Sequence, residues 1–468
     1  MTQAPLPGGP FVIMGLARSG LAAALQLLKR GVPVRVTDLK PARELAAEVD
    51  SLQAAADRSG ARLEIHLGAH PEAMLQGAAA LILSPGIPPE APYVRQAAAA
   101  GLPVWSEVEL AYRLLQGTVA GITGSNGKST TTALTAHILE QAGRVAFAAG
   151  NIGRAMSDFL AQDGPEAIFV TELSSFQLET IDRFHPKIAA FLNFTPDHLD
   201  RYPSLEAYAE AKWNLFRNMT AGDAAVLNGN DPALRRQAAR ILCPVYFFDS
   251  RPVSEPDAIH GAGIVQDTLW LRTSGAPIRL LARGEIPVPG RHNLENALAA
   301  ALMCHLLGLD AAKIAAGIRS YRPLPHRLQF VAEVAGRSFY NDSKATNVDS
   351  TLLAIQSFEQ PIVLILGGKD KGSPYTPLLE TMRRRVRHCL VIGQATSKIE
   401  QELGHQVAMT RCRDLAEAVG RSLEFSQPGD VVLLSPACAS YDQFRDYEQR
   451  GEVFVQSVRR LRLERGGL

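Results

Sequence analysis

The chain has 468 residues, of which 48 are basic and 47 acidic, so its formal net charge is +1. This length corresponds to about three domains at the usual ~150 residues each, and the near-balanced charge gives no global field to attract nucleic acid or an anionic membrane. The five cysteines (Cys243, Cys304, Cys389, Cys412 and Cys438) are scattered and never spaced as Cys-x-x-Cys, which argues against a disulfide framework or a zinc site and predicts reduced, mostly buried thiols.

The first ten residues lack the basic region of a signal peptide, and the apolar stretch after them is interrupted by Gly15, Arg18 and Gly20. Neither a secretory signal nor a membrane span is therefore predicted. We expect a cytoplasmic protein whose partners are small molecules, with no nucleic acid and no membrane among them. We also expect it to be a monomer.

Short β-branched runs alternate with Ala/Leu-rich helical patterns along the whole chain. The predicted strands are 11–14, 33–37, 79–83, 168–173, 362–366, 389–392 and 431–434. Such alternation predicts α/β units on mostly parallel sheets. We expect three domains, residues 1–106, 107–323 and 324–468, of which the outer two are Rossmann-like and the central one resembles a P-loop ATPase. Pro323 and Pro325 would stiffen a short tether before the last domain.

The turn after the first predicted strand reads Gly15-Leu16-Ala17-Arg18-Ser19-Gly20, and Asp38 ends the next strand, as in a dinucleotide-binding fingerprint. Ala17 replaces the middle glycine of that fingerprint, and its methyl group obstructs the close backbone approach of a pyrophosphate. The turn therefore argues against NAD or FAD without excluding them.

Residues 121–130 read Gly-Ile-Thr-Gly-Ser-Asn-Gly-Lys-Ser-Thr and lie between an apolar run and a helical one, where a phosphate-binding loop belongs. Glycines let backbone N–H groups converge on phosphate oxygens, the helix N-terminus adds partial positive charge, and Lys128 adds a full charge. Ser129 can place its hydroxyl on Mg²⁺. The first glycine of the general pattern would fall at position 122, which is isoleucine, yet a turn that binds nothing has little use for Lys128. The loop predicts binding of a nucleoside triphosphate.

Glu172 follows the apolar run 168–170, at the carboxyl end of a predicted strand. A charged side chain at that end of a central strand usually faces a ligand crevice. Mg²⁺ prefers a few carboxylates together with phosphate oxygens and water, so we expect Glu172 to hold Mg²⁺ near Ser129. Capping of the following helix is the simpler alternative.

The helix predicted after residue 204 carries Leu205, Tyr208, Lys212 and Leu215 along one stripe, which puts the lysine on its inward face. Desolvation can lower a lysine pKa by up to about 3–5 units from ~10.4 and so produce the neutral amine. On spacing alone, a Lys212 that extends to solvent is an equally good interpretation. His198 also follows an apolar run and so projects from a strand end, although a lone histidine there is more often a loop residue with no chemical role.

The segment Gly290-Arg291-His292-Asn293-Leu294-Glu295-Asn296-Ala297 opens a long Ala/Leu-rich helix. Asn293 and Asn296 share a face of this helix and can present amide groups to a purine edge. His326 and Arg327 on the tether would complete a clamp on adenine and on ribose or phosphate. An ordinary helix capped by asparagine is the alternative.

Three motifs together resemble the Mur ligase family, whose members form amide bonds at the expense of ATP. They are Thr-Gly-x-Asn-Gly-Lys-Ser-Thr at 123–130, Glu-Leu-Ser-Ser-Phe-Gln-Leu-Glu at 172–179 and Gly-x-His-Asn-x-x-Asn-Ala-Leu-Ala-Ala at 290–300. The second motif resembles the branch that adds D-glutamate, not those that add alanine, diaminopimelate or lysine. The resemblance covers nearly the whole chain. It implies an ATP-dependent acid–D-amino-acid ligase that joins D-glutamate to UDP-N-acetylmuramoyl-L-alanine through an acyl phosphate, in peptidoglycan precursor synthesis and hence in cell wall biogenesis, cell shape and cell division.

The resemblance also implies which residues bind the first two substrates. The first-domain turns would cradle the uridine nucleotide, with its uracil near Asp38. The expected contacts of the UDP-linked substrate are Leu16, Ala17, Asp38, Lys40, Gly86 and Asn151. The expected ATP contacts are Gly124, Asn126, Gly127, Lys128, Ser129, Thr130, Asn293, Asn296, His326, Arg327 and Asp342, the last accepting a ribose hydroxyl.

Two Mg²⁺ sites are implied by the same resemblance. In the family the lysine that matches Lys212 is carbamylated by CO₂, and the resulting anion holds the second Mg²⁺ together with the matching histidine. The expected metal ligands are Ser129, Glu172, His198 and the Lys212 carbamate, and the expected catalytic residues are Lys128, Glu172, His198 and Lys212.

The third domain would bind the incoming D-glutamate through loops that follow its strands. The expected contacts are Thr346, Lys371, Ser440, Tyr441 and Tyr447. Lys369 lies two residues from Lys371 and is the alternative cation. The family pattern commonly has leucine at the position of Tyr441 and phenylalanine at the position of Tyr447.

Three other classes of protein compete with this interpretation. A ligase like folylpolyglutamate synthase would share the central and C-terminal domains but would lack residues 1–106. A dehydrogenase would need NAD at Ala17 and would leave Lys128 unexplained. A non-catalytic nucleotide-binding protein would not require Glu172, His198 and Lys212 together.

Overall fold

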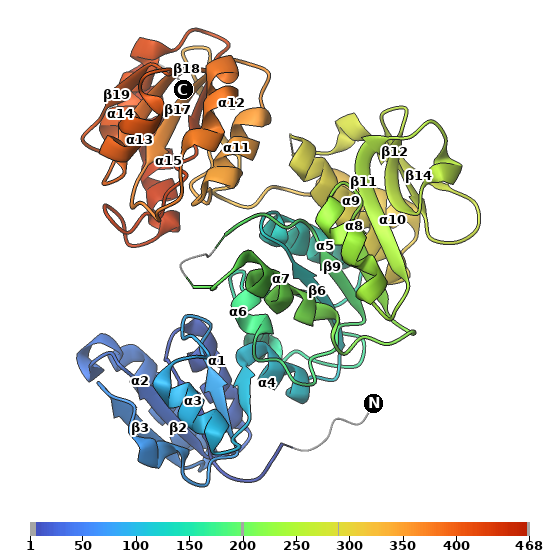
Figure 1. Ribbon diagram of the computed structural model, residues 1–468, viewed down its shortest axis with the longest axis vertical. Helices are drawn as coiled ribbons and strands as arrows, with labels where there is room; N and C mark the ends of the chain where they lie inside the picture. The colour runs from blue at the N-terminus through green and yellow to red at the C-terminus, as the bar shows by residue number, and fades with distance from the viewer. Residues whose placement is uncertain (1–5, 198–200, 289, 466–468) are drawn as a thin grey trace. The chain divides into compact units, whose positions relative to one another are not determined.

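The computed structural model describes residues 6–197, 201–288 and 290–465. It divides into two compact units, of which one comprises Met1–Glu285 and Glu295–Tyr321 and the other comprises Ile286–Leu294 and Arg322–Leu468. The described residues form three sheets, here called the first, central and third sheets, with helices packed against each (Figure 1). The α/β fold with mostly parallel sheets is thus confirmed, whereas the boundaries proposed at residues 106 and 323 stay predictions.

The first sheet is parallel, with the strand order β3-β2-β1-β4-β5. Its strands are β1 (Phe11–Met14), β2 (Val34–Asp38), β3 (Leu63–Leu67), β4 (Ala80–Leu83) and β5 (Val104–Ser106), and its helices are α1 (Arg18–Lys29), α2 (Ala46–Ser59), α3 (Pro92–Ala99) and α4 (Glu107–Leu114). Side chains of β1 alternate between two cores, because Phe11 and Ile13 pack with α1 and α2 while Val12 and Met14 pack with α3. The strand order reverses between β1 and β4, and ligands of such sheets bind at the carboxyl ends of the strands at this point.

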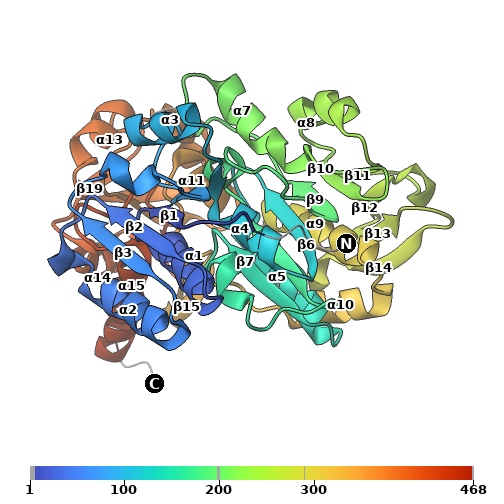
Figure 2. The same ribbon diagram turned by 90° about the horizontal axis from the view of Figure 1, so that it is seen from below.

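The central sheet has the strand order β14-β13-β12-β11-β10-β9-β6-β8-β7, parallel from β7 to β12 and antiparallel beyond it. Its strands are β6 (Thr118–Thr123), β7 (Ala146–Gly150), β8 (Ile168–Glu172), β9 (Ile188–Phe191), β10 (Ala224–Asn228), β11 (Val245–Pro252), β12 (Gly261–Val265), β13 (Thr268–Arg272) and β14 (Ile278–Ala282). Its helices are α5 (Lys128–Gln141), α6 (Ser175–Leu178), α7 (Leu205–Trp213), α8 (Pro232–Gln237), α9 (Arg291–Leu306) and α10 (Ala311–Ser320). Helix α5 packs along β7 and β8, and Figure 2 shows it beside β7. The loop before α5 therefore opens at the carboxyl edge of the sheet.

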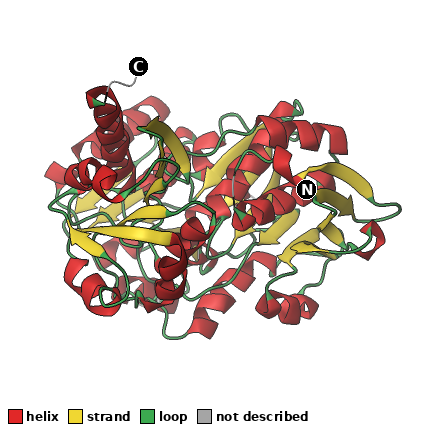
Figure 3. Cartoon of the chain, turned by 90° about the horizontal axis from the view of Figure 1, so that it is seen from above, coloured by secondary structure: helices red, strands yellow, loops and turns green. Residues whose placement is uncertain are grey.

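The third sheet has the strand order β15-β16-β20-β17-β18-β19, antiparallel only between β15 and β16. Its strands are β15 (Gln329–Val334), β16 (Arg337–Asn341), β17 (Ile362–Gly367), β18 (Val386–Ile392), β19 (Met409–Arg411) and β20 (Val431–Leu434), and its helices are α11 (Val348–Gln356), α12 (Leu379–Arg385), α13 (Thr396–Leu403), α14 (Leu415–Phe425) and α15 (Tyr447–Glu464). Leu364 and Leu366 of β17 pack with α11, α12 and α13, while Val363 and Ile365 pack with α14 and α15. Figure 3 distinguishes these helices from the strands that they cover.

The predicted strands correspond to β1, β2, β4, β8, β17, β18 and β20, most of them to within one residue at each end. The largest difference is β18, which begins three residues earlier than expected, at Val386. Helix α7 ends at Trp213, so Leu215 lies in a following 3₁₀ turn, yet it is fully buried as its place in the stripe predicts.

All five cysteines are buried, as the composition predicts. No helix within 6–197, 201–288 and 290–465 has both the length and the apolar character needed to cross a membrane.

Candidate active site

The phosphate loop lies between β6 and α5, as its sequence predicts. Gly124 and Gly127 have φ of 152° and 82°, in the region that favours glycine. A Cβ atom at Gly127 would lie 2.3 Å from Oδ1 of Asn296, so the space also requires glycine there. The same Oδ1 atom accepts a hydrogen bond from the hydroxyl of Thr131 at 3.2 Å. The loop is therefore fixed to the helix that carries the predicted adenine contact Asn296.

Asn193, which follows β9, holds the other side of the loop. Its backbone carbonyl accepts from the amide of Ser125 at 3.0 Å, and its side chain exchanges two hydrogen bonds with the backbone of Asn126, at 2.8 and 3.0 Å. Asn193 is not among the site residues that the sequence predicts. Its signal was its position, a polar side chain directly after a buried strand at the same sheet edge as Glu172.

Two lysines from distant helices meet at one carbonyl oxygen. The Nζ atom of Lys128 donates to the carbonyls of Gly124 and Ser125, each at 2.8 Å. The Nζ atom of Lys212 donates to the same Gly124 oxygen at 3.0 Å. Two ammonium groups this close would repel each other strongly away from water, which favours one charged and one neutral amine.

Of this pair, Lys212 is the one whose neutral form is favoured by burial. Ser204 caps α7 by accepting from the amide of Ala207 at 3.2 Å, and the helix then buries Lys212 to 2% exposure beside the ring of Tyr208. Desolvation, followed by the charge of Lys128, lowers the pKa of Lys212 well below 10.5, against the opposing effect of nearby carboxylates. The alternative in which Lys212 extends to solvent is therefore wrong.

Glu172 is the last residue of β8, and only one of its two carboxylate oxygens accepts a hydrogen bond from the described residues. Its Oε1 atom accepts from Nδ2 of Asn151 at 2.9 Å, whereas its Oε2 atom is buried and has no hydrogen-bond partner among the described residues. The capping alternative is wrong, because Ser174 caps the following helix α6. A buried, open carboxylate oxygen is a suitable ligand for Mg²⁺.

The described residues contain no cluster of three or more His, Cys, Asp or Glu side chains able to hold a metal. A Mg²⁺ ion at Glu172 would therefore depend on phosphate and water oxygens for most of its ligands, which is the usual pattern for this ion. His198, the other predicted ligand, lies outside the described residues.

The predicted binding site of the first sheet is built around Asp38, at the end of β2. Its two carboxylate oxygens accept from the backbone amides of Leu16 at 2.6 Å and Lys40 at 2.9 Å. Ser84 donates its hydroxyl to the carbonyl of Gly15 at 2.8 Å, which joins the turns after β1 and β4. These hydrogen bonds bring together the turns that contain the predicted Leu16, Ala17, Asp38, Lys40 and Gly86, of which Ala17, Lys40 and Gly86 are exposed.

Asn151 directly follows β7 of the central sheet. Its side chain donates to Glu172, and it makes no hydrogen bond with Asp38 or the turns around it among the described residues. Side chains nevertheless join the two regions: Arg18 at the start of α1 donates to the carbonyl of Gly153 at 2.7 Å. Arg201 donates to the carbonyls of Pro85 at 2.9 Å and Ile87 at 3.4 Å, in the turn after β4.

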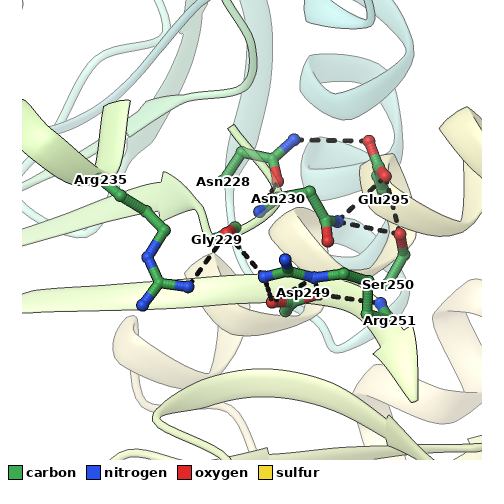
Figure 4. Close-up of polar contacts among 8 residues, drawn as sticks. All are labelled: Asn228, Gly229, Asn230, Arg235, Asp249, Ser250, Arg251 and Glu295. Carbon is green, nitrogen blue, oxygen red and sulfur yellow. Dashed lines mark hydrogen bonds and ion pairs between the residues drawn. The ribbon is translucent and has the colours of Figure 1, made fainter. Parts of the chain in front are cut away.

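A polar network holds α9 at the carboxyl ends of β10 and β11 (Figure 4). Glu295 accepts from the hydroxyl of Ser250 at 2.7 Å and from the side-chain amides of Asn230 at 3.1 Å and Asn228 at 3.4 Å. Asn228 also donates to the carbonyl of Leu192, at 2.9 Å. Because Glu295 precedes Asn296 on α9, the network also fixes the approach of Asn296 to the phosphate loop. No sequence motif pointed to these residues.

On the third sheet, the predicted ribose acceptor Asp342 is buried directly after β16. It accepts from the hydroxyl of Ser435 at 2.9 Å and from the amide of Leu328 at 3.2 Å. Burial raises its pKa to about 7, with these hydrogen bonds opposing the shift. His326 takes a positive φ of 63° and lies 2.9 Å from Nδ2 of Asn341, so the tether is fixed to the end of the same strand.

The predicted D-glutamate contacts differ in exposure. Ser440 is buried, Thr346 is half-buried, and Lys371 and Tyr441 are exposed, while the ring of Tyr447 lies under the Nζ atom of Lys344, 3.6 Å from it. The loops of Lys369 and Ala439 are joined by two backbone hydrogen bonds, at 2.8 and 3.2 Å. The roles of all these residues in binding stay predictions.

Family models match most of the chain. The model described as the Mur ligase MurD-like N-terminal domain matches residues 10–106, the Mur ligase middle domain matches 122–304, and the Mur ligase glutamate ligase domain matches 326–438.

Curated proteins and solved structures agree with these matches. Proteins named UDP-N-acetylmuramoylalanine–D-glutamate ligase are 41% identical in Trichlorobacter lovleyi, over 96% of this chain and 98% of theirs, and 43% identical in Anaeromyxobacter dehalogenans, over 97% and 98%. Two Thermotoga maritima structures, of UDP-N-acetylmuramate-alanine ligase MurC and of MurF ligase in complex with ADP, share the fold with TM-scores of 0.58 at 18% and 17% identity. They cover 96% and 92% of this chain, and 99% and 95% of their own. The chain belongs to the Mur ligase family.

Proposed function

We propose that this protein is an ATP-dependent ligase that adds D-glutamate to UDP-N-acetylmuramoyl-L-alanine in peptidoglycan precursor synthesis. The similarity over nearly the full length of proteins named for this reaction supports the choice of substrates. The observation that carries the chemistry is the convergence of Lys128, Lys212 and the open oxygen of Glu172 at the carboxyl edge of β6 and β8.

The reaction would proceed in two steps. The terminal carboxylate of the UDP-linked alanine attacks the γ-phosphorus of ATP, and the bond to ADP breaks, which gives an acyl phosphate. The amine of D-glutamate then attacks the acyl carbon, loses a proton and displaces inorganic phosphate. Lys128 would exchange its bonds with the Gly124 and Ser125 carbonyls for phosphate oxygens, since phosphoryl transfer depends mainly on positioning and charge stabilisation.

We propose that Ser129 and Glu172 hold Mg²⁺, which would neutralise the charge on the ATP phosphates. For Lys212 we propose a carbamate, because a neutral amine can attack CO₂ with formation of an N–C bond and loss of one proton. The carbamate and His198 would provide the second Mg²⁺ site. The lowered pKa of Lys212 is the property that supports this assignment.

The substrate subsites follow from the family resemblance. We propose that the UDP-linked substrate binds at Leu16, Ala17, Asp38, Lys40, Gly86 and Asn151, and that ATP also uses Gly124, Asn126, Gly127, Thr130, Asn293, Asn296, His326, Arg327 and Asp342. D-Glutamate would bind at Thr346, Lys371, Ser440, Tyr441 and Tyr447. We further propose a monomeric, cytoplasmic enzyme, in keeping with its five buried thiols and balanced charge.

A phosphate-release assay with each substrate left out in turn tests the function. We expect turnover only when ATP, Mg²⁺, UDP-N-acetylmuramoyl-L-alanine and D-glutamate are all present, and none with L-glutamate in place of D-glutamate. Equal turnover with L-glutamate or with a diamino acid would contradict the proposed substrate. Turnover that needs a folate in place of the UDP-linked substrate would favour the folylpolyglutamate synthase-like alternative.

A further inference from the structure

Arg450 is the largest fully buried side chain of the protein's described residues and has no place in the site described so far. It lies in the first turn of α15, and its relative exposure is 0%. Along the same stripe of the helix follow Phe454, Val458 and Leu461, which belong to the core of the third sheet. An arginine thus occupies a position where the helix pattern would place an apolar residue.

The guanidinium group holds two of the loops expected to bind the amino acid. Its Nε atom donates to the hydroxyl of Ser343 at 3.0 Å, and one terminal nitrogen donates to the carbonyl of Ser343 at 2.8 Å. The other terminal nitrogen donates to the carbonyls of Cys438 at 3.1 Å and Ala439 at 3.4 Å. Ser343 precedes Thr346 in the loop after β16, and Ala439 precedes Ser440 in the loop after β20.

A third loop closes over the same group. A Cβ atom at Gly368 would clash with the carbonyl oxygen of Ala439 and would lie 3.2 Å from the guanidinium nitrogen that bonds Cys438. The loop with Lys369 and Lys371 therefore passes close to Arg450. Arg450 therefore touches or adjoins each of the three loops that carry predicted D-glutamate contacts.

No carboxylate neutralises this cation directly. Among the described residues, every hydrogen-bond acceptor of Arg450 is a carbonyl or a hydroxyl oxygen, and no ion pair includes it. The nearest acidic groups, Asp342 and Asp442, act on it only at longer range. Asp342 is itself buried, with a pKa raised to about 7, so it carries only part of a negative charge near neutral pH.

The charge nevertheless persists at neutral pH. Burial lowers the pKa of Arg450 only to about 10, opposed by the neighbouring acidic groups. Taking a charge out of water costs several kcal/mol unless other interactions offset it, and the field of a buried charge is weakly screened by water and salt. A cation kept in such a place attracts an anion that enters the adjoining loops.

We propose that Arg450 is a positioning residue that also supplies a fixed positive charge for the incoming acidic amino acid, so that the third domain prefers a dicarboxylic substrate. This inference rests on the proposed function. Under this proposal α15 contributes to substrate selection together with Lys369 and Lys371. These two lysines are exposed, so their charges are solvated and screened and attract an anion less strongly than a buried charge does.

The test compares three variants of the full-length enzyme by steady-state kinetics. Arg450→Gln keeps hydrogen-bond donors and removes the charge, while Arg450→Lys removes the fork and keeps an amine that is charged only when protonated. Arg387→Gln is the matched control, since Arg387 binds Asp430 at 2.8 Å near the amino-terminal edge of the same sheet. Each variant is first checked for a cooperative thermal transition like that of the wild type.

We expect Arg450→Gln to raise the KM for D-glutamate at least about tenfold, as a charge effect of this range would. The KM values for ATP and the UDP-linked substrate should change less than about threefold, and the D-glutamate KM of Arg450→Lys should approach the wild-type value as the pH is lowered. Unchanged D-glutamate KM in Arg450→Gln, or parallel increases in all three KM values, would overturn the proposal, and so would an equal increase in Arg387→Gln.

Arg450→Lys provides a second test should the glutamine variant not fold. A buried lysine loses its proton at lower pH than arginine, so the KM for D-glutamate should rise between about pH 5.5 and pH 9.5 in this variant more than in the wild type. A purely structural role of Arg450 would give Arg450→Lys and the wild type the same pH profile. That result would refute the charge effect. If the wild-type enzyme does not use D-glutamate at all, the proposed function is contradicted. If the wild type turns over normally and Arg450→Gln has the same KM for D-glutamate, only this inference is contradicted.

Discussion

Lys212 and Arg450 are two buried basic side chains, and burial favours the neutral form of the lysine while it leaves the arginine charged. Each lies on the inward face of a helix, Lys212 on α7 and Arg450 on α15. Each donates to a backbone carbonyl close to residues predicted to contact a substrate. Among the described residues, the Nζ atom of Lys212 donates to one carbonyl and lies 4.7 Å from the centre of the Tyr208 ring. The guanidinium of Arg450 donates to four acceptors. Burial lowers the pKa of both, far for the lysine and only to about 10 for the arginine.

The difference follows from the chemistry of the two side chains. A lysine ammonium is a compact charge that loses its proton when desolvated, while a guanidinium spreads its charge over a planar fork that carbonyls can satisfy. The same burial therefore favours the neutral, nucleophilic amine at Lys212 and leaves the charge in place at Arg450. Variants that exchange or remove these properties test whether this contrast has functional meaning.

The largest effect is expected from removal of the reactive amine. Lys212→Ala and Lys212→Arg both exclude a carbamate, and each should reduce kcat by a factor that corresponds to several kcal/mol, because the metal charge is then misplaced. A small carboxylic acid such as acetate should partly restore Lys212→Ala but not Lys212→Arg, whose side chain fills the space. Full activity of the alanine variant, or an unmodified Lys212 in a well-resolved structure of the active enzyme, would contradict the carbamate.

A second prediction uses the pH dependence of stability. The folded-state pKa of Lys212 lies well below its unfolded value of 10.5, so the unfolded chain binds more protons between these two values. Wild-type stability should therefore rise relative to Lys212→Met as pH increases through this window. Urea unfolding at a series of pH values in CO₂-free buffer measures the difference. A constant difference across the window would mean that Lys212 remains charged in the folded protein.

Asp342 provides a third prediction, because it decides how much of the Arg450 charge is opposed. Its pKa is raised from 3.8 to about 7, so the folded state binds more protons in this interval and stability should fall as pH rises through it. Three pKa units correspond to roughly 4 kcal/mol, an upper value for the total change. Asp342→Asn should remove this slope, as measured by hydrogen exchange of amides in β16 and β20. A slope that survives the substitution belongs to another group.

The smallest effect is expected at an exposed cation. Arg460 on α15 is 83% exposed and pairs with Glu464 at 2.9 Å, one helical turn away. Arg460→Ala should change the free energy of unfolding by less than about 0.5 kcal/mol, since water and salt screen such pairs. Its D-glutamate KM should equal that of the wild type. A larger change would show that burial is not what separates Arg450 from the other arginines of this helix.

Much of the fold was predictable because parallel strands bury both faces and leave continuous apolar runs, as at 362–366 and 431–434. The antiparallel strands β13 and β14 were missed. In Thr268–Arg272 the buried residues alternate with half-exposed ones, and Ile278 is 36% exposed, so no continuous run marks them.

The candidate site was predictable where one local motif contains it, as in the phosphate loop. Lys212 was found because its stripe is otherwise apolar. Arg450 was not, although it lies on the stripe of Phe454, Val458 and Leu461, because its partners Ser343 and Cys438 are distant in sequence and only the fold brings them to it. The network of Glu295 was missed for the same reason, since only the folded sheet brings β10, β11 and α9 together.

The buried cysteines have a practical consequence. Burial raises the pKa of all five thiols, to about 11 for Cys243 and Cys438, so at neutral pH they are both protonated and shielded. Thiolate is the form that reacts with maleimides and disulfides, so the native chain should take up almost no label. Cysteines introduced at exposed positions, such as Glu166→Cys and Arg459→Cys, would then be the sole attachment points for a pair of fluorescent dyes. With one dye on each compact unit, energy transfer between them reports ligand-dependent motion in an otherwise unaltered enzyme.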